Sequence, residues 1–356
     1  MKRVLVAMSG GVDSSVAAYL LKKQGYDCIG VTMKLYEGED GRESTCCSLS
    51  DVEDAKAVCR RLGIPHYTFN FTADFEAQVI DPFVKSYEQG RTPNPCIDCN
   101  RRLKFERLYH RGMELGCDYI ATGHYVRRVE HDDGTVALYK ASDPEKEQSY
   151  VLYNMTQEQL KKTLFPLGDL QKSQVREIAE AQGFLNAHKH DSQDICFVPD
   201  GDYAAFIEEY TGKIYPPGPV LDAQGNRLGT HRGIIHYTVG QRKGLGLALG
   251  QPMYVKSTDA ETNTLVLGRN EELFSHRVYA EHLNWIPGEP PEGPLEVVAR
   301  VRYHGKDQPA MLYFLESGRI RAEFQVPQRA VTPGQAIVFY SGDQMLGGAE
   351  ITKSEA

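Results

Sequence analysis

Apolar runs and amphipathic stretches alternate along the first half of the chain. Apolar runs predict strands at 4–8, 28–33, 66–71 and 118–122, and amphipathic stretches predict helices at 14–24, 51–62, 103–115 and 173–182. This βαβα order favours an α/β fold with a parallel, doubly wound sheet and helices on both of its faces. Ligands of such sheets bind beyond the carboxyl ends of the strands. We therefore expect the residues that follow 4–8, 28–33 and 118–122 to share one crevice.

The pattern changes after about residue 200, where Pro- and Gly-rich loops separate short strand-like runs. Runs at 219–222, 234–239, 252–258 and 264–268 predict a small β-rich domain. Further runs at 278–285, 295–303, 310–314, 320–324, 336–340 and 347–351 predict a barrel or a sandwich. A chain of 356 residues is long for one domain, and we expect three, at 1–203, 204–275 and 276–356.

Composition excludes some classes of protein. The chain holds no run of about 18 apolar residues, so we expect no membrane span. Its start runs into a strand without the features of a signal peptide, and we expect a cytoplasmic protein. The net charge of −8 argues against non-specific nucleic-acid binding by the whole surface. A local basic stretch, which a solvated helix face explains equally well, contains Arg101, Arg102, Lys104, Arg107 and Arg111.

The segment Ser9–Ser14, SGGVDS, lies between the first predicted strand and the first predicted helix. Glycines allow tight turns, and the first N–H groups of a helix have no intrahelical partner, so such a loop favours a phosphate. No Lys-Ser/Thr pair closes the loop, so it is not a Walker motif. A plain tight turn also needs glycine, and the alternative is a turn without a ligand.

Two cysteine segments are the other candidates for chemistry. Cys96 and Cys99 form a Cys-x-x-Cys pair before the basic stretch, where a helix N-terminus and nearby cations favour a reactive thiolate. A lone pair can also be half of a zinc site, but no second spaced pair exists. Cys196 lies in a polar, acid-flanked segment, where a buried structural thiol is the alternative. The eight cysteines have no regular spacing, and in a reducing compartment we expect them to be free, catalytic or metal-bound rather than paired in structural disulfides.

Several motifs together resemble those of tRNA-specific 2-thiouridylases, which are pyrophosphate-loop ATPases. They are SGGVDSS at 9–15, NPCIDCNRRLKF at 94–105, ATGHY at 121–125, SQDICFV at 192–198 and GIIHYTVGQRKGLG at 233–246. The resemblance covers nearly the whole chain and keeps the order of the motifs. It implies an adenine nucleotide α-hydrolase-like catalytic domain, a small β-rich central domain and a C-terminal β-barrel that contacts tRNA. The implied reaction makes 2-thiouridine at the wobble position.

The resemblance also implies how sulfur enters the base. ATP would adenylate the C2 oxygen of uridine, with Mg²⁺ shielding the phosphates and Asp13 as the nearest carboxylate. Cys196 would carry sulfur as a persulfide supplied by a sulfur-donor protein, and Cys99 would attack it, which leaves a transient Cys99–Cys196 disulfide. The implied nucleotide-binding residues are Ala7, Met8, Ser9, Gly10, Gly11, Val12, Asp13, Ser14, Met33 and Gly123.

Position 96 departs from the pattern, because many members of that family carry Asp there. Cys96, Cys99 and Cys196 could therefore offer three thiolates to a [4Fe-4S] cluster with an open fourth site. The resemblance further implies contacts with the anticodon arm of tRNA, and we expect a monomer. The implied tRNA-binding residues are Asn94, Pro95, Cys96, His124, Lys146, Glu147, Gln148, Arg302, Tyr303 and Gln335.

Two other functions remain open on the residues. An ATP pyrophosphatase-type ligase or amidotransferase of the same fold would release AMP without needing reactive cysteines. A non-catalytic nucleotide sensor would bind ATP without turnover and would tolerate loss of Cys99 or Cys196.

Overall fold

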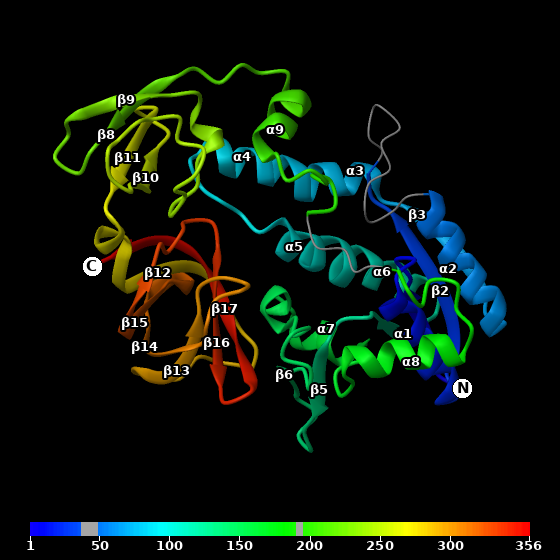
Figure 1. Ribbon diagram of the computed structural model, residues 1–356. Coiled ribbons are helices and arrows are strands. Elements are labelled where there is room, and N and C mark those ends of the chain that lie inside the picture. The colour runs from blue at the N-terminus through cyan, green and yellow to red at the C-terminus, as the bar shows by residue number, and fades with distance from the viewer. Residues whose placement is uncertain (37–48, 190–194) are drawn as a thin grey trace. The chain divides into compact units, whose positions relative to one another are not determined.

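The alternating first half of the chain folds into a parallel sheet (Figure 1). Its strands are β1 (Arg3–Ala7), β2 (Asp27–Lys34), β3 (His66–Asn70), β4 (Tyr119–Ala121) and β7 (Thr163–Leu164), in the order β3-β2-β1-β4-β7. The pairings between these neighbours are all parallel. The chain moves outward from β1 to β3 and then returns beside β1 with β4. This reversal puts the expected ligand site at the carboxyl ends of β1 and β4.

The structure, a computed structural model, describes residues 1–36, 49–189 and 195–356. Within them, contacts separate two units. The first comprises Met1–Val79, Pro95–Gly201 and Asp343–Leu346, and the second comprises Ile80–Asn94, Asp202–Gly342 and Gly347–Ala356.

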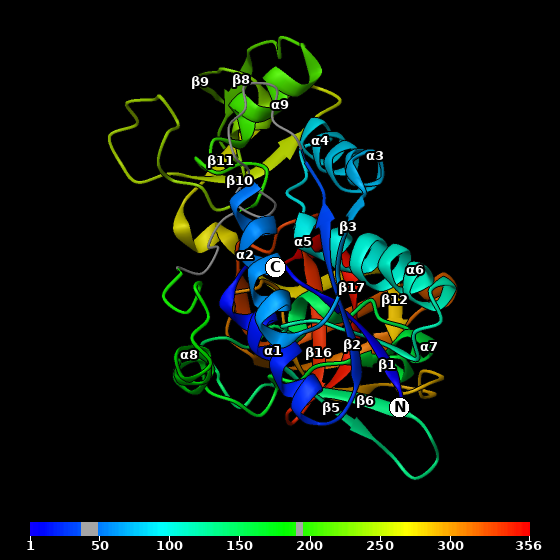
Figure 2. The ribbon, with the colours of Figure 1, turned by 90° about the vertical axis from the view of Figure 1, so that its right-hand side faces the viewer.

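Helices cover both faces of the parallel sheet, as alternation along β1 requires. Val4 and Val6 join the core formed with α1 (Val12–Lys23), α2 (Leu49–Leu62) and α8 (Lys172–Ala181). Leu5 points the other way, 3.4 Å from where a Cβ on Gly112 of α6 (Leu108–Glu114) would lie. Figure 2 shows α1, α2 and α8 on one side of these strands and α6 on the other. The predicted doubly wound α/β sheet is thus confirmed.

The first unit also contains shorter elements around the sheet. Cys99–Arg107 is a π-helical segment that runs from α5 into α6, whereas the sequence predicts a regular helix over 103–115. Such π-helical turns often occur at functional sites. Further elements are α3 (Thr72–Phe75), the π-helical segment Glu76–Ile80 that follows it, α5 (Pro95–Asp98), β5 (Val126–Glu130), β6 (Val136–Lys140), the 3-10 turn Ser149–Leu152 and α7 (Gln157–Lys161).

The second unit contains a closed barrel, which confirms the first of the two expected β architectures. Its strands are β12 (Phe274–Trp285), β13 (Leu295–Arg300), β14 (Gln308–Phe314), β15 (Ile320–Arg329), β16 (Ala336–Ser341) and β17 (Gln344–Glu355). They follow the order β12-β15-β14-β13-β16-β17, and β12 also pairs with β17. Closure leaves no open edge, and alternate residues such as Val278 and Ala280 are buried.

A smaller sheet in the second unit forms the expected β-rich region. It contains β8 (Gly218–Leu221), β9 (Arg227–His231), β10 (Tyr254–Asp259) and β11 (Thr264–Gly268), in the order β10-β11-β8-β9. Its core includes Val220, Tyr237, Val255 and Leu265. The helices α4 (Asp81–Glu88) and α9 (Tyr203–Thr211) belong to the same unit.

One predicted strand is wrong. Residues Ile234–His236 form a 3-10 turn, preceded by Gly233 at φ +126°. Ile234 and Ile235 are both buried although they are adjacent, which a turn allows and a strand with one exposed face does not. No helix within the described ranges is long and apolar enough to cross a membrane.

Gly347 gives a test of barrel closure. A Cβ there would lie 2.0 Å from the carbonyl oxygen of Asn284 on β12, and its φ is +145°. We expect Gly347→Ala to lower the free energy of unfolding by about 2–4 kcal/mol. Gly342→Ala is the control, because Gly342 also has positive φ but has open space around it, and it should cost about 1–2 kcal/mol. Equal losses in denaturant titrations would show that the contact with β12 does not matter.

Candidate functional site

The loop Ser9–Ser14 joins β1 to α1 and is held by its own hydroxyl groups. Ser14 Oγ accepts from the Ser9 N–H at 3.2 Å and donates to the Gly11 carbonyl at 3.1 Å, while Ser15 Oγ donates to the same carbonyl at 2.9 Å. Gly11 is the N-cap of α1 and supplies no capping side chain. The first N–H groups of α1, at the positive end of its dipole, thus lie beside a loop suited to an anion.

Two glycines let neighbouring backbone approach this loop. A Cβ on Gly10, where φ is +75°, would lie 2.4 Å from the carbonyl oxygen of Asp51 at the start of α2. A Cβ on Gly123, just after β4, would lie 2.8 Å from the Ser14 nitrogen and 2.9 Å from the Asp13 carbonyl carbon. The structure therefore brings Gly123 against the loop, as the topology of the sheet requires.

Met33, the other candidate nucleotide contact, is a buried residue near the carboxyl end of β2. Its neighbour Thr32 donates to the Met8 carbonyl at 2.9 Å and is also 2.9 Å from His66 Nε2. Met8 and Met33 are thus tied to the same edge of the sheet as the loop. Their contact with a nucleotide, like that of Ala7 and Val12, stays a prediction.

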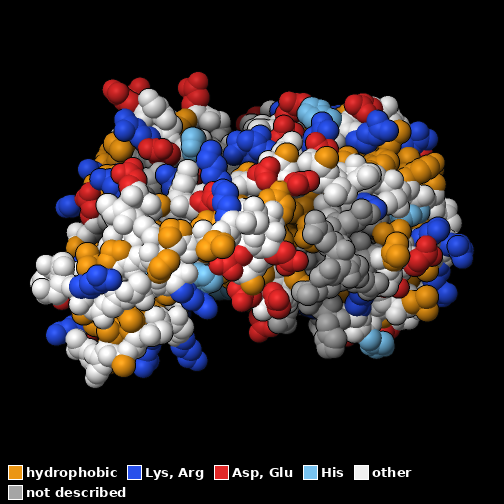
Figure 3. Space-filling view, turned by 90° about the horizontal axis from the view of Figure 1, so that it is seen from above, with side chains coloured by type: hydrophobic (Ala, Val, Ile, Leu, Met, Phe, Trp, Pro, Cys, Tyr) orange, Lys and Arg blue, Asp and Glu red, His pale blue; other side chains and the backbone are white. Residues whose placement is uncertain are grey.

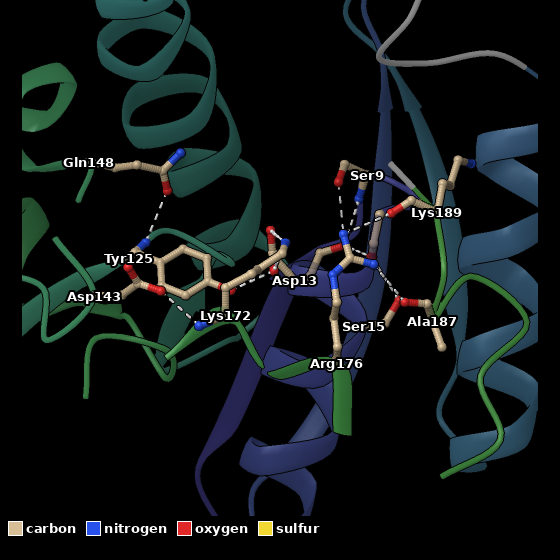
Figure 4. Close-up of polar contacts among 12 residues, drawn as sticks. Ser9, Asp13, Ser15, Tyr125, Asp143, Gln148, Lys172, Arg176, Ala187 and Lys189 are labelled. Atoms are coloured by element: carbon tan, nitrogen blue, oxygen red, sulfur yellow. Dashed lines mark hydrogen bonds and ion pairs between the residues drawn. The ribbon is translucent and has the colours of Figure 1, made fainter. Parts of the chain in front are cut away.

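Asp13 forms the polar centre of the site (Figure 4). Its Oδ1 accepts from the Tyr125 hydroxyl at 2.7 Å, and Lys172 Nζ contacts Oδ1 and Oδ2 at 2.7 and 2.8 Å. Lys172 is the first residue of α8, and its backbone N–H donates to Asp143 Oδ2 at 2.8 Å. Sequence reasoning missed Lys172 and did not assign Tyr125 a role. The available signal was a cation in the first turn of a helix, where the dipole disfavours it.

Asn186 is a second residue that sequence reasoning missed. Its side chain is buried, and Nδ2 donates to the Gly10 carbonyl at 2.8 Å and contacts Ser15 Oγ at 2.9 Å. Its Oδ1 has no hydrogen-bond partner among the residues that the structure describes. Arg176 of α8 holds the same segment by donating to the Ala187 and Lys189 carbonyls at 3.0 and 3.3 Å (Figure 4). Residues 186–189 thus contact the loop and the first turn of α1.

Lys189 fixes the start of α2 beside the loop. Its Nζ lies 2.7 Å from both Asp51 and Asp54. Burial alone would lower the pKa of Lys189, but the hydrogen bonds that its ammonium donates to Asp51 and Asp54 outweigh burial and raise the pKa. The ammonium is therefore held in its charged form.

The cysteine segments belong to the first unit. Cys96 is exposed in α5, whereas Cys99 and Cys196 are partly exposed thiols. Phe197, next to Cys196, packs edge-on against Phe75 of α3 at 5.7 Å. Asp74 of α3 pairs at 2.9 Å with Arg107, in the segment that begins at Cys99. The two thiol-bearing segments thus share α3 as a neighbour, and the approach of the sulfurs stays a prediction.

The predicted tRNA-binding residues of the first unit have defined local contacts. Gln148 exchanges hydrogen bonds with the backbone of Tyr125, both at 3.0 Å, and buried Glu147 accepts from the Ser149 N–H at 2.5 Å. Lys146 is partly exposed beside them. Pro95 is buried at the start of α5. Polar contacts of the turn itself therefore hold Glu147 and Gln148 in place.

His124 is 8% exposed, and its ring packs against those of Phe105 and Phe165, at 5.9 and 6.3 Å. Its Nδ1 is 2.7 Å from Thr122 Oγ1. Burial, followed by the charge of Lys104, lowers the pKa of His124 well below its ordinary value, so the ring is neutral. Its expected contact with tRNA stays a prediction.

The other predicted tRNA-binding residues lie in the second unit. Gln335 Nε2 donates to the Thr92 carbonyl at 2.7 Å, close in sequence to partly exposed Asn94. Arg302 donates to the carbonyl of Ala330, and the ring of Tyr303 lies 4.7 Å from that of His304. These contacts define their local positions, and their role on RNA stays a prediction.

Several arginines of the basic stretch form ion pairs with acidic side chains. Arg102 pairs with Glu106 at 3.3 Å and Arg111 with Glu114 at 2.8 Å. On the described part of the face in Figure 3, basic and acidic side chains are likewise interspersed. This arrangement favours a solvated, paired helix face over a strongly basic phosphate track.

Family models match the chain in three consecutive segments. A tRNA methyl transferase HUP domain matches residues 2–200, a tRNA methyl transferase PRC-barrel domain matches 204–269, and an aminomethyltransferase beta-barrel domain matches 275–351. The tRNA-specific 2-thiouridylase of Lachnoclostridium phytofermentans is 53% identical over 99% of this chain and 100% of its own length. That of Acetivibrio thermocellus is 52% identical over 98% and 99%. The chain belongs to the tRNA-specific 2-thiouridylase family.

Likeness to solved structures is weaker than likeness to these 2-thiouridylases. A 4-thiouridine synthetase–RNA complex with bound ATP matches 58% of this chain and 50% of that chain, at 17% identity and a TM-score of 0.38. We infer nothing from that likeness.

The metals expected of this 2-thiouridylase-family chain do not fit the observed residues. Both carboxylate oxygens of Asp13 contact Lys172, so we assign Asp13 no Mg²⁺. Within the described residues, which include Cys96, Cys99 and Cys196, no three His, Cys, Asp or Glu side chains gather as a metal site. An iron–sulfur cluster on these thiols therefore has no built site, and we route no step through one.

The close approach of Gly123 gives a test of the nucleotide site. In Gly123→Ala the added methyl would meet the backbone of Ser14 and Asp13, which cannot move without shifting the loop. We expect ATP binding to weaken by about tenfold or more in titration calorimetry. Gly134→Ala, in open space in the β5–β6 hairpin, is the control and should bind ATP normally. Normal binding by Gly123→Ala would contradict this placement of the site.

The buried ring of His124 predicts a pH dependence of stability. The folded state keeps the ring neutral, whereas the unfolded chain protonates it below about pH 6.5. Below that pH the unfolded state binds more protons than the folded state. The free energy of unfolding therefore decreases as the pH is lowered, by at most about 1.4 kcal/mol per pH unit. In His124→Asn, the drop in melting temperature between about pH 7.5 and about pH 5.5 should be smaller. An unchanged drop would show that His124 does not titrate on unfolding.

Proposed function

We propose that the protein uses ATP to replace the C2 oxygen of the wobble uridine of tRNA with sulfur. The observation that carries the proposal is 52–53% identity to tRNA-specific 2-thiouridylases over 98–99% of the chain. The loop Ser9–Ser14, at the switch point of the sheet, supports ATP use. By family, the activity is that of a tRNA-uridine 2-sulfurtransferase.

The chemistry explains why ATP is consumed. The C2 carbonyl carbon of uracil is a weak electrophile, and its oxygen is a poor leaving group. In the proposed first step that oxygen attacks the α-phosphorus of ATP, the bond to the β-phosphate oxygen breaks, and pyrophosphate leaves with the electron pair. The N3 proton is lost from the adenylated base. AMP can then leave from C2 when sulfur attacks.

The loop at the carboxyl end of β1 is suited to the first step. Its backbone donors and the dipole of α1 favour the negative charge that develops on pyrophosphate. In this proposal Met33 and Gly123 frame the adenine and the ribose. Mg²⁺ would enter with the phosphates, and we assign it no protein ligand.

The second step needs sulfur in a nucleophilic form. We place a persulfide on Cys196, loaded by a sulfur-donor protein. Cys99 thiolate attacks the Cys196 sulfur, forms the Cys99–Cys196 disulfide and releases hydrosulfide, which attacks C2 and expels AMP. A dithiol reductant must then restore both thiols in each cycle. Their shared neighbour α3 supports the convergence of the two segments.

The tRNA must present an unstacked base, because the reacting atom is inaccessible within a stack. We assign residues 1–203 to catalysis, 204–275 to the central domain and 276–356 to a barrel that contacts the anticodon arm. In this assignment the target base lies near residues 94–96, 124 and 146–148. The anticodon arm contacts Arg302, Tyr303 and Gln335.

One assay separates this proposal from its alternatives. The purified protein is incubated with ATP, Mg²⁺, sulfide and unmodified tRNA, and both AMP and thiolated uridine are quantified. The proposal predicts both products, and both should require tRNA. AMP without thiolation would favour a ligase of the same fold, and binding of ATP without AMP would favour a sensor.

Cys196→Ala separates activation from sulfur transfer. With a persulfide donor in place of free sulfide, we expect thiolation to fall below detection while adenylated tRNA and pyrophosphate still form, because the thiol acts after activation. Cys117→Ala is the matched control, since Cys117 is a buried thiol between α6 and β4, and it should keep both steps. Loss of the adenylate in Cys196→Ala, in a protein that still melts cooperatively, would contradict the assigned role.

A further inference from the structure

Lys172 occupies a position that needs an explanation. It is the first residue of α8, where the positive end of the helix dipole disfavours a cation. Its side chain is 11% exposed, so its charge is largely removed from water. A buried ammonium requires anionic partners, and Asp13 of the loop Ser9–Ser14 is such a partner.

Asp13 is equally unusual as a partner. It lies in the first turn of α1, in the loop proposed to hold the phosphates of ATP. A bare carboxylate there would repel pyrophosphate, but Lys172 contacts both of its oxygens, and Tyr125 donates to one of them. The pair therefore makes the loop electrically neutral and holds an ammonium beside the phosphate site (Figure 4).

We propose that Lys172 binds the pyrophosphate group of ATP, and that Asp13 and Tyr125 position its ammonium. This inference rests on the proposed function. When the bond from the α-phosphorus to the bridging oxygen breaks, the electron pair stays on pyrophosphate, and Lys172 stabilises that charge without giving up a proton. Asp13 is then a positioning residue, which explains why its oxygens face Lys172.

Binding of inorganic pyrophosphate tests this role without relying on turnover. Lys172→Met should weaken the binding of inorganic pyrophosphate in Mg²⁺ by about tenfold or more, because a charge-assisted contact is lost. It should also lower the rate of AMP formation by about 100-fold, mainly through kcat. Lys172→Arg keeps the charge and should recover part of the binding. Lys23→Met, at the exposed far end of α1, is the matched control and should behave as the natural protein does.

Removing Lys172 leaves the partly buried Asp13 without its cation, so Lys172→Met can lose its fold. The double variant Lys172→Met/Asp13→Asn removes both charges, and circular dichroism and melting check its fold. It should bind pyrophosphate as weakly as Lys172→Met. Asp13→Asn alone should weaken the binding by less than Lys172→Met does, because the ammonium remains but loses part of its positioning, and it should keep the natural Mg²⁺ dependence.

Two results would overturn the inference. One is natural pyrophosphate affinity in a folded variant that lacks Lys172. The other is an Asp13→Asn variant that binds pyrophosphate as weakly as Lys172→Met and needs more Mg²⁺, which would make Asp13 the ligand. Thiolation by the natural protein is measured in parallel. If it is absent, the proposed function fails, whereas normal thiolation with either result above overturns only the role of Lys172.

Discussion

The close approach of backbone at Gly123 to the first turn of α1 is the constraint on which the candidate site depends. The return of the chain from β3 to β4 puts the carboxyl ends of β1 and β4 side by side. Gly123 can lie this close to Ser14 because it has no side chain. Gly10 allows the same closeness between the loop and α2. The anion-binding loop is therefore shaped by backbone packing on two sides, and side chains tune it afterwards.

Electrostatic pairing forms the second level of the site. Two lysines beside the loop are paired with carboxylates before a nucleotide arrives, Lys172 with Asp13 and Lys189 with Asp51 and Asp54. Such pairing keeps buried charges stable and holds long side chains in defined positions. A bound polyphosphate would then meet prepositioned ammonium groups, so little reorganisation is needed when charge develops on the leaving group.

Local patterns predicted the sheet, the barrel and the loop because each depends on residues near one another in sequence. Apolar runs predict β1 to β4, and the glycines of Ser9–Ser14 predict the turn. The contact between Lys172 and Asp13 joins residues 159 apart, so no local pattern could place it. The burial of His124 could not be predicted either, since its motif does not reveal that Phe105 and Phe165 pack against its ring. At Ile234 and Ile235, tertiary burial overrode strand preference.

The central claim is that ATP activates the C2 oxygen of the target uridine. Its most direct measurement uses an anticodon-arm RNA that carries ¹⁸O at C2 of the wobble uridine, followed by mass spectrometry of the nucleotide products. The account predicts that the label appears in AMP, with one labelled oxygen for each thiolated uridine. Label found in pyrophosphate or in water, or retained in the thiolated product, would contradict it.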